Sequence, residues 1–362
     1  MKGKKPSGRT LDAFKTAHDP NVKIANLEAE LKQALSESAD AAAIKRLVGT
    51  ALSALDQYEP PQWTVTPQKQ SSSPGVPTLF LSDFHWGEIV RGSQIGGVNS
   101  FNLAIGRQRL QKTVETAIEL CGILDPQMRY PGIVVPLGGD MVSGNIHEEL
   151  QATNEVNTMP TVLDLHDWLK VAINRLAEAF GKVFLPCVTG NHGRDTRKTW
   201  AKDRTHTSFD WLLYQFLARS FKDDPRVTFF IPDGSDALYR IFGTRYNLTH
   251  GDQFKAGDSI IGPIGPLMRG NQKKTARNQA INQEYDVLLA GHWHQYIHLS
   301  RLIVNGSLKG YDEYASQGNF GFEPPTQALW ITHPKFGITF RMPVYCSTPK
   351  VEPRAGWAEV PK

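Results

Sequence analysis

Five short apolar runs in this 362-residue chain are each followed closely by side chains that can bind a metal ion. Apolar runs of this length predict buried strands, and open α/β sheets carry their functional groups beyond the carboxyl ends of their strands. One such tripeptide, Gly190-Asn191-His192 after the run 183–188, would by itself be an ordinary turn. Five runs together predict one shared site, built from Asp83, His85, Asp140, Asn191, His192, His250, His292 and His294.

The spacing of these residues suggests how they share one volume. Side chains at positions i and i+2 of an extended segment point the same way, so Asp83 with His85, and His292 with His294, can each present two ligands together. Asp140 adds a carboxylate suited to bridging two cations. Carboxylate, imidazole and amide ligands without thiolate suit Mn²⁺, Fe²⁺, Zn²⁺ or Ni²⁺. Two such ions about 3.5–4 Å apart can clamp a phosphate and activate a water molecule.

The order of these motifs, Asp-x-His, Gly-Asp, Gly-Asn-His, His and Gly-His-x-His, resembles the calcineurin-like metallophosphoesterase superfamily over residues 83–294. The resemblance implies a four-layer αββα sandwich and two divalent metal ions, of which Mn²⁺ is expected before Fe²⁺, Zn²⁺ or Ni²⁺. It also implies that His192 is the general acid that protonates the leaving oxygen. The first ion would be held by Asp83, His85, Asp140 and His294, and the second by the bridging Asp140, Asn191, His250 and His292.

Residues beside the ligands differ from the patterns of individual branches of this superfamily. Residues 139–145 lack the arginine with which phosphoprotein phosphatases bind phosphate. Gly193 stands where those enzymes, and nucleases of the double-strand-break repair type, carry an acidic residue, and Asp195 is a candidate replacement. The stretches 138–147 and 304–314 resemble uncharacterised members from bacteriophage and prophage genomes. The resemblance therefore favours a phage-type member that is distantly similar to DNA nucleases.

Positive charge is concentrated near the predicted site. Arg194 lies two residues beyond His192, and Lys273 and Lys274 precede the Gly-His-x-His motif, so we expect these three to contact substrate phosphate. The leading interpretation is a phosphodiesterase that attacks DNA with a metal-bridging hydroxide, as a nuclease or end-processing enzyme. The alternatives are a phosphatase or phosphodiesterase of nucleotides or other small phosphoesters, and a non-catalytic binding protein that kept the fold. The cations could also be solvated loop charges without a substrate role.

Composition divides the chain into four parts. Residues 1–59 hold a lysine-rich tail and amphipathic helical segments, which either pack on the parent domain or form a coiled-coil arm of a homo-oligomer. Residues 60–77, rich in proline and serine, predict a linker. A catalytic α/β domain is expected at 78–348 and a tail at 349–362.

Hydrophobic periodicity predicts the elements of the catalytic domain. The insertion between His250 and Asp286, which contains several glycines, is expected to form a wall or a mobile lid. Helices are expected at 103–124, 162–180, 209–221 and 279–284, and strands at 78–81, 133–137, 183–188, 227–231, 238–242, 246–249, 287–290, 302–304, 328–332 and 338–342.

Composition also bears on the compartment of the protein. The net charge of +4 is too small to indicate nucleic-acid binding by itself. Cys121, Cys187 and Cys346 lie far apart and match no zinc or redox spacing, which favours a reducing compartment. No signal peptide and no apolar run of roughly 18 residues is visible. We expect a cytoplasmic protein without a membrane partner, located in the bacterial host if it is phage-encoded.

Overall fold

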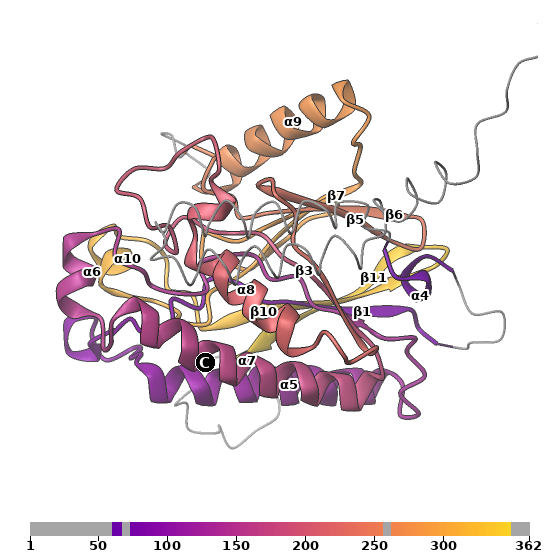
Figure 1. Cartoon of the computed structure of the whole chain (residues 1–362), viewed down its shortest axis with the longest axis horizontal. Coiled ribbons are helices and arrows are strands. Elements are labelled where there is room, and N and C mark those ends of the chain that lie inside the picture. The colour runs from indigo at the N-terminus through magenta and orange to yellow at the C-terminus, as the bar shows by residue number, and fades with distance from the viewer. Residues whose placement is uncertain (1–59, 67–72, 256–261, 349–362) are drawn as a thin grey trace, which may run out of the picture. The chain divides into compact units, whose positions relative to one another are not determined.

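Two β-sheets lie between layers of helices in the part of the chain that the computed structural model describes, residues 60–66, 73–255 and 262–348 (Figure 1). These residues belong to one unit, residues 60–362. Each sheet mixes parallel and antiparallel pairs, so the predicted α/β fold class is confirmed. The predicted N-terminal helical appendage, residues 1–59, and the C-terminal tail lie outside the described residues.

The first sheet has six strands in the order β11-β10-β1-β2-β3-β4. Strands β1 to β4 run parallel to one another, while β10 and β11 are antiparallel additions at one edge. The parallel strands are completely buried from β1 to β3, which explains why their sequences are continuous apolar runs. The strands are β1 (Val76–Phe80), β2 (Ile133–Val134), β3 (Val183–Pro186), β4 (Val227–Phe230), β10 (Thr326–His333) and β11 (Gly337–Tyr345).

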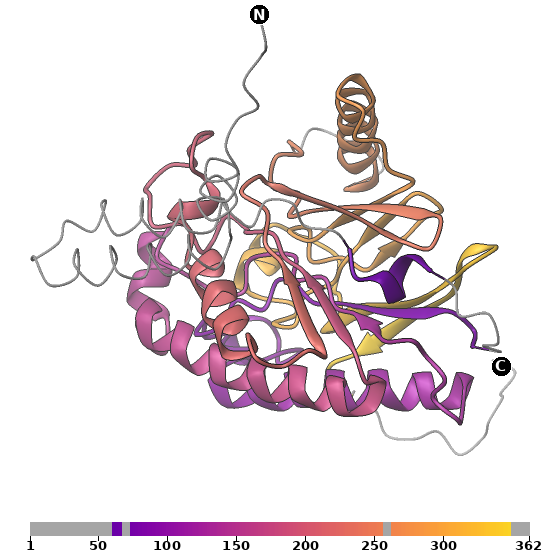
Figure 2. The same cartoon turned by 45° about the vertical axis from the view of Figure 1, so that its right-hand side comes forward.

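Three helices cover the outer face of the first sheet: α5 (Leu103–Leu124), α7 (Thr158–Phe180) and α8 (Phe209–Ser220) (Figures 1 and 2). All three were predicted from apolar spacing. In α7, for example, Val162, Leu165, Leu169 and Leu176 are buried at intervals of three, four and seven residues. The helix ends at Gly181, whose φ of 75° is a left-handed conformation that glycine adopts without strain.

The second sheet has five strands in the order β5-β6-β7-β9-β8, and it faces the first sheet through aromatic side chains. The rings of Tyr246 and Trp330 lie 6.1 Å apart, and the Tyr246 hydroxyl is 2.7 Å from Thr332 Oγ1. Helix α9 (Ile264–Ala280) packs on the opposite face through Leu267. The strands are β5 (Asp236–Ile241), β6 (Thr244–Thr249), β7 (Val287–Ala290), β8 (Ile297–His298) and β9 (Leu302–Val304).

One expectation about local structure was wrong, and a second segment holds more regular structure than its composition indicated. The short helix α4 (Gln62–Val65) lies within the segment expected as linker; Thr64 is buried in it, and its carbonyl accepts a hydrogen bond from the Phe242 amide. The helix expected at 279–284 is instead the end of α9, and turn residues follow it. The buried face of α9 includes the polar residues Asn271 and Lys274. The spacing of apolar residues therefore does not show the helical period of this segment.

The loops at the carboxyl ends of the parallel strands carry the predicted ligands and several short elements. None of the helices in the described residues is both long enough and apolar enough to cross a membrane. Cys121, Cys187 and Cys346 are buried and unpaired. The short elements are η1 (Gly92–Gln94), α6 (Glu148–Thr153), η2 (Thr205–Thr207) and α10 (Glu313–Gln317).

Candidate metal centre

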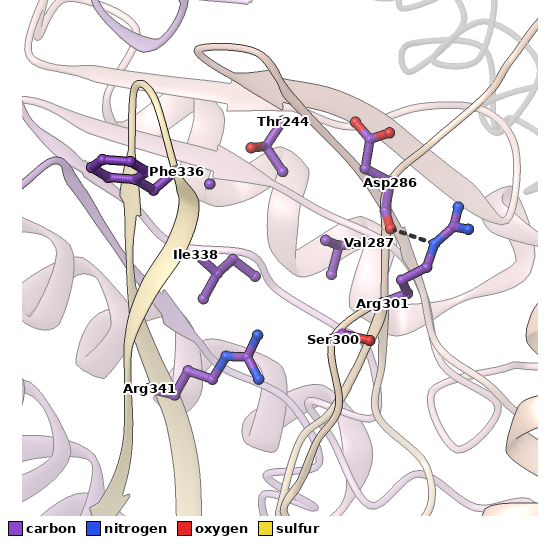
Figure 3. Close-up of a pocket in the computed structure, with 9 residues that line it drawn as sticks. Thr244, Asp286, Val287, Ser300, Arg301, Phe336, Ile338 and Arg341 are labelled. Carbon is purple, nitrogen blue, oxygen red and sulfur yellow. Dashed lines mark hydrogen bonds between the residues drawn. The ribbon is translucent and has the colours of Figure 1, made fainter.

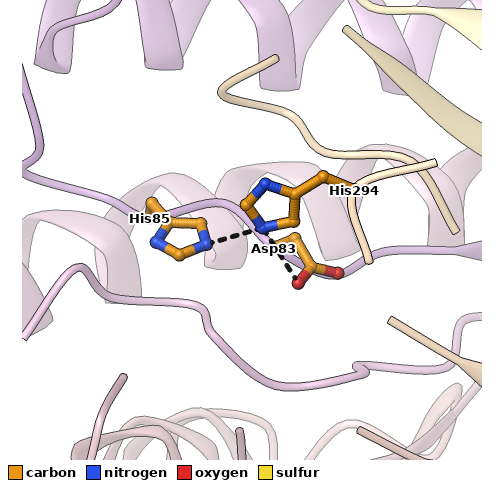
Figure 4. A group of neighbouring side chains, drawn as sticks. All are labelled: Asp83, His85 and His294. Atoms are coloured by element: carbon orange, nitrogen blue, oxygen red, sulfur yellow. Dashed lines mark hydrogen bonds and ion pairs between the residues drawn. The ribbon is translucent and has the colours of Figure 1, made fainter. Parts of the chain in front are cut away.

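Three side chains from loops more than 200 residues apart converge at one end of the site (Figure 4). His85 Nε2 lies 3.0 Å from His294 Nε2, and the latter lies 3.5 Å from Asp83 Oδ1. Asp83 and His85 are buried, and His294 is partly exposed. Two imidazole nitrogens and a carboxylate oxygen thus face a common point, as the ligands of a divalent cation do.

A second group adjoins the first and shares the loop around Asp140. His250 Nε2 lies 3.0 Å from Asp140 Oδ2 and 3.1 Å from Asn191 Oδ1. Asp140, His250 and His292 can offer ligand atoms within 4.8 Å of one another, and so can His85, Asp140 and His192. Asp140 therefore lies between the two groups, where the resemblance places a bridging carboxylate.

The backbone of the ligand loops is not the extended chain that the sequence argument assumed. Asp83, His85, Asp140, His292 and His294 all have positive φ, between 46° and 68°. They are five of the ten non-glycine residues with positive φ in the described part of the chain. Such conformations cost on the order of 1–3 kcal/mol each and persist only where the surrounding structure imposes them. The predicted ligands converge through strained turns rather than through strand alternation.

Hydrogen bonds fix the orientation of two of the imidazole rings, and a carboxylate lies beside a third. His250 Nδ1 lies 2.8 Å from the Gly138 carbonyl, and His192 Nδ1 lies 3.1 Å from the Ser143 carbonyl. These nitrogens donate, so the Nε2 atom of each ring faces the cluster, where that of His250 can bind a cation and that of His192 can carry a proton. The partner of His192 is thus a backbone carbonyl, available without the acidic residue that Gly193 replaces. His85 Nδ1 lies 3.3 Å from a carboxylate oxygen of Glu88.

The electrostatics of the cluster favour the protonation states of metal ligands. Burial, together with the positive charge of Lys309, lowers the pKa of His85 to about 3. Burial lowers the pKa of His292 to about 4, with His250 contributing. Burial by itself would raise the pKa of Asp140, but the neighbouring His250 holds it well below the ordinary value. At neutral pH the cluster therefore offers neutral His85 and His292 and an ionised Asp140. Against the effect of burial, Asp140 raises the pKa of His250 to about 10, so a cation that binds there must displace the proton of that ring.

Two glycines let the ligand loops approach one another closely. A Cβ on Gly190 would lie 2.1 Å from Asp140 Oδ1, and a Cβ on Gly291 would lie 2.4 Å from Asp83 Oδ2. Both contacts are far inside van der Waals range. The glycines of the Gly-Asn-His and Gly-His-x-His motifs are therefore required by the packing of one loop against the carboxylate of another.

Asp210, which the sequence analysis missed, ties together the loops that carry Asp140 and Asn191. It is fully buried and accepts hydrogen bonds from the amides of Asp140 at 3.0 Å, Met141 at 3.1 Å and Gly190 at 2.9 Å. Burial and the nearby Asp140 raise the pKa of Asp210 to about 6. No local motif could have indicated it, because it lies on α8 at no characteristic spacing from the ligands.

A buried ion network supports His85 from the other side. Glu88 contacts His85, and its other oxygen accepts a hydrogen bond from Lys309 Nζ at 2.8 Å. The Lys309 ammonium also lies 2.6 Å from Asp312 Oδ2. Lys309, which follows the last ligand motif, is therefore an internal cation and not part of an exposed basic rim.

The three predicted substrate contacts are placed differently from one another. Arg194 donates to the carbonyls of Asn191 at 2.7 Å and Thr196 at 3.1 Å, so its guanidinium braces the ligand loop. Lys274 is buried and pairs with Asp236 at 2.5 Å. Lys273 is exposed on α9. The first two side chains are engaged within the protein, and their predicted role in substrate binding stays a prediction.

A cavity of about 310 Å³ lies away from the metal ligands (Figure 3). Thr244 and Val287, which line it, begin strands β6 and β7, whereas His250 and His292 follow the ends of these strands. Arg341 from β11 completes the opposite wall. The cavity is therefore at the amino ends of the parallel strands and is not the substrate pocket of the metal centre.

Comparisons with known proteins give distant structural likenesses only. No known family model and no curated protein matches the sequence. A predicted phosphoesterase from Streptococcus pneumoniae is 12% identical, with a TM-score of 0.27 over 70% of this chain and 82% of that one. Vacuolar Protein Sorting 29 from Cryptosporidium parvum is 12% identical, with a TM-score of 0.28 over 71% and 84%. The sulfate thiohydrolase SoxB from Thermus thermophilus is 8% identical, with a TM-score of 0.31 over 76% and 57%. At these values the likenesses say nothing about activity, which is inferred from the site itself.

Proposed function

We propose that this protein is a metal-dependent phosphoester hydrolase of the metallophosphoesterase type. The observation that carries the proposal is the convergence of all seven predicted ligands into adjoining groups around Asp140, with His192 beside them. The donor set fits hard or borderline divalent cations, because it contains carboxylate, imidazole and amide groups and no thiolate. The carbonyls that accept hydrogen bonds from Nδ1 of His250 and His192 also suit a metal site, because they leave the Nε2 atoms of both rings directed into the cluster.

The residues divide the work of hydrolysis between binding and proton transfer. Asp83, His85, His294 and Asp140 would hold one cation, and Asp140, Asn191, His250 and His292 the other. Bound divalent cations supply Lewis-acid activation of water and neutralise charge on the phosphate. His192 donates its Nδ1 hydrogen to the Ser143 carbonyl, so it would take up a second proton at Nε2 from water and pass that proton to the leaving oxygen. Asp210 and Glu88 hold the ligand loops and are positioning residues.

We propose further that the substrate is a nucleic-acid phosphodiester. Exposed cations follow His192 directly in the chain, which favours a polyanionic substrate. Phosphatase or phosphodiesterase activity on nucleotides or other small phosphoesters remains the second candidate, because the same metal centre would serve it.

The test combines metal analysis with hydrolysis of bis(4-nitrophenyl) phosphate in Mn²⁺. Asp140→Ala should lose bound metal and activity together, because the carboxylate lies between both ligand groups. His192→Ala should keep its metal and lose roughly 10²- to 10⁴-fold in rate, the usual contribution of a general acid. Asp224→Asn, at the opposite end of the sheet before β4, is the matched control and should resemble wild type.

Two results would contradict the proposal: wild type that binds no metal after Mn²⁺ loading, or both variants hydrolysing at the wild-type rate. End-labelled single- and double-stranded DNA, incubated beside the His192→Ala variant, then separates the substrate classes. Shortened DNA with wild type alone supports the nuclease. Intact DNA from protein that still hydrolyses the aryl phosphodiester favours small phosphoesters.

A further inference from the structure

We propose that residues 196–202, the basic loop, form a binding element for single-stranded nucleic acid beside the metal centre. The loop would hold backbone phosphates with its cations and stack an unpaired base on Trp200. This inference rests on the proposed function and specifies its substrate. In place of Arg194 and Lys274, it assigns the substrate contacts to side chains farther along the loop that contains Arg194.

Both ends of the basic loop are fixed next to His192. The Phe209 amide donates to the Gly193 carbonyl at 2.7 Å, and the Asp195 amide donates to the Thr207 carbonyl at 2.8 Å. Arg194 also forms a β-bridge with Ser208. The chain between β3 and α8 therefore leaves the metal centre and returns to it, with residues 196–202 as its outer part (Figures 1 and 2).

The outer part of this loop is basic and exposes an indole ring. Residues 196–202 contain Arg197, Lys198 and Lys202 and no carboxylate. All three cations are exposed, and no ion pair joins their side chains to another described residue. Trp200 is 55% exposed, unlike Trp86 and Trp211, which are buried. An exposed tryptophan among unpaired cations is the composition of a single-strand binding surface.

Two other cations near the site are already neutralised within the protein. Arg204 pairs with Asp252 at 2.8 Å, and Lys309 lies between Glu88 and Asp312. Such pairs have no charge left for a substrate. The unpaired cations of the basic loop, in contrast, can release counterions from a phosphate backbone without first breaking an internal ion pair.

The loop is close enough to the metal centre for one strand to contact both. Arg197 lies five residues after His192, so their Cα atoms are at most about 18 Å apart even in a fully extended chain. A strand whose phosphodiester is cleaved beside His192 can therefore reach the loop within a few nucleotides. Stacking on Trp200 requires an unpaired base, which selects single strands over duplex.

The test measures binding of a short fluorescein-labelled single-stranded DNA by anisotropy, with EDTA present to prevent cleavage. The triple variant Arg197→Ala/Lys198→Ala/Lys202→Ala should raise Kd by about tenfold or more, and should lower the slope of log Kd against log salt by about 2. Trp200→Ala should raise Kd about fivefold or more for the single strand and leave duplex binding unchanged.

The control variant also removes three positive charges, but from exposed lysines outside the basic loop: Lys170→Ala/Lys182→Ala/Lys222→Ala. It should leave the salt slope and Kd near wild type. Wild-type affinity in both loop variants, or an equal loss in the control, would overturn the proposal, and so would equal effects of Trp200→Ala on duplex and single strand.

Hydrolysis of bis(4-nitrophenyl) phosphate separates this inference from the proposed function. Loop variants should hydrolyse it at the wild-type rate, and a loss there would assign the loop to the metal centre instead. If wild type itself hydrolyses nothing, the proposed function fails, while the binding measurements still decide whether the loop holds single strands.

Discussion

Replacing Gly193 with aspartate would introduce the acidic residue that the sequence resemblance leads us to expect after Asn-His, and we expect it to damage this protein. A Cβ at this position would lie 2.9 Å from Asp210 Oδ1 and 3.0 Å from its Cγ. Overpacking of this kind costs about 1–3 kcal/mol, which Gly193→Ala would show alone. Gly193→Asp adds a second buried carboxylate next to Asp210. At about 4 Å and an effective dielectric constant of about 20, two ionised carboxylates would repel by about 4 kcal/mol. Because the pKa of Asp210 is about 6, this carboxyl can instead take up a proton at pH 7, which limits the cost of the repulsion to about 1.4 kcal/mol.

Urea unfolding of the metal-free variants at neutral pH measures this difference. Gly193→Asp should be less stable than Gly193→Ala by about 1.4 kcal/mol at pH 7, and it should bind less metal, because Asp210 holds the amide of Asp140. The gap should narrow below about pH 6, where Asp210 takes up a proton. If Gly193→Asp is as stable as Gly193→Ala at pH 7, the geometry described for Asp210 is wrong.

Three further predictions follow from contacts around the ligands. Glu88→Gln removes the charge beside His85 Nδ1 and should weaken Mn²⁺ binding about 10- to 100-fold, measured by titration. Gly190→Ala forces a methyl group against Asp140 and should lower metal content and hydrolysis as far as loss of that carboxylate does. The pKa of Asp210 lies above its ordinary 3.8, at about 6, so the folded metal-free protein binds this proton more tightly than the unfolded chain. Its stabilising contribution is therefore complete below about pH 4 and lost as pH rises through 6; relative to Asp210→Asn, wild type should lose about 3 kcal/mol of unfolding free energy between these conditions.

A control variant and two possible outcomes test whether these three predictions are correct. Gly234→Ala, where an added Cβ meets nothing within 4 Å, should behave like wild type in metal content. Unchanged Mn²⁺ affinity in Glu88→Gln would remove Glu88 from the support of His85. Parallel pH profiles for wild type and Asp210→Asn would show that Asp210 titrates normally.

Much of the fold was predictable because it is recorded in local periodicity. Helix α5 begins and ends where its apolar spacing indicated, and the buried parallel strands appear as continuous apolar runs. Helix α9 was misplaced because its buried face includes Asn271 and Lys274, which are held by polar contacts that no hydrophobic pattern reveals.

The residues that support the site were not predictable from spacing. Asp210 acts on Asp140 from 70 residues away, and Lys309 reaches Glu88 from 221 residues away. Their contributions depend on burial and on contacts between elements, and neither quantity has a local sequence signal. The engagement of Arg194 with the Asn191 carbonyl was hidden for the same reason.

Side-chain chemistry and strand patterning are local properties, so the order of the amino acids was enough to identify the groups that can bind metal and to place them after strand ends. The folded chain alone shows that Asp83 and His85 converge with His294 through left-handed backbone, and that Asp236 neutralises Lys274. Arg197, in contrast, has no ion-pair partner among the described residues. Convergence and neutralisation depend on which distant segments pack together, and that is set by the burial of the two sheets against each other and their helices.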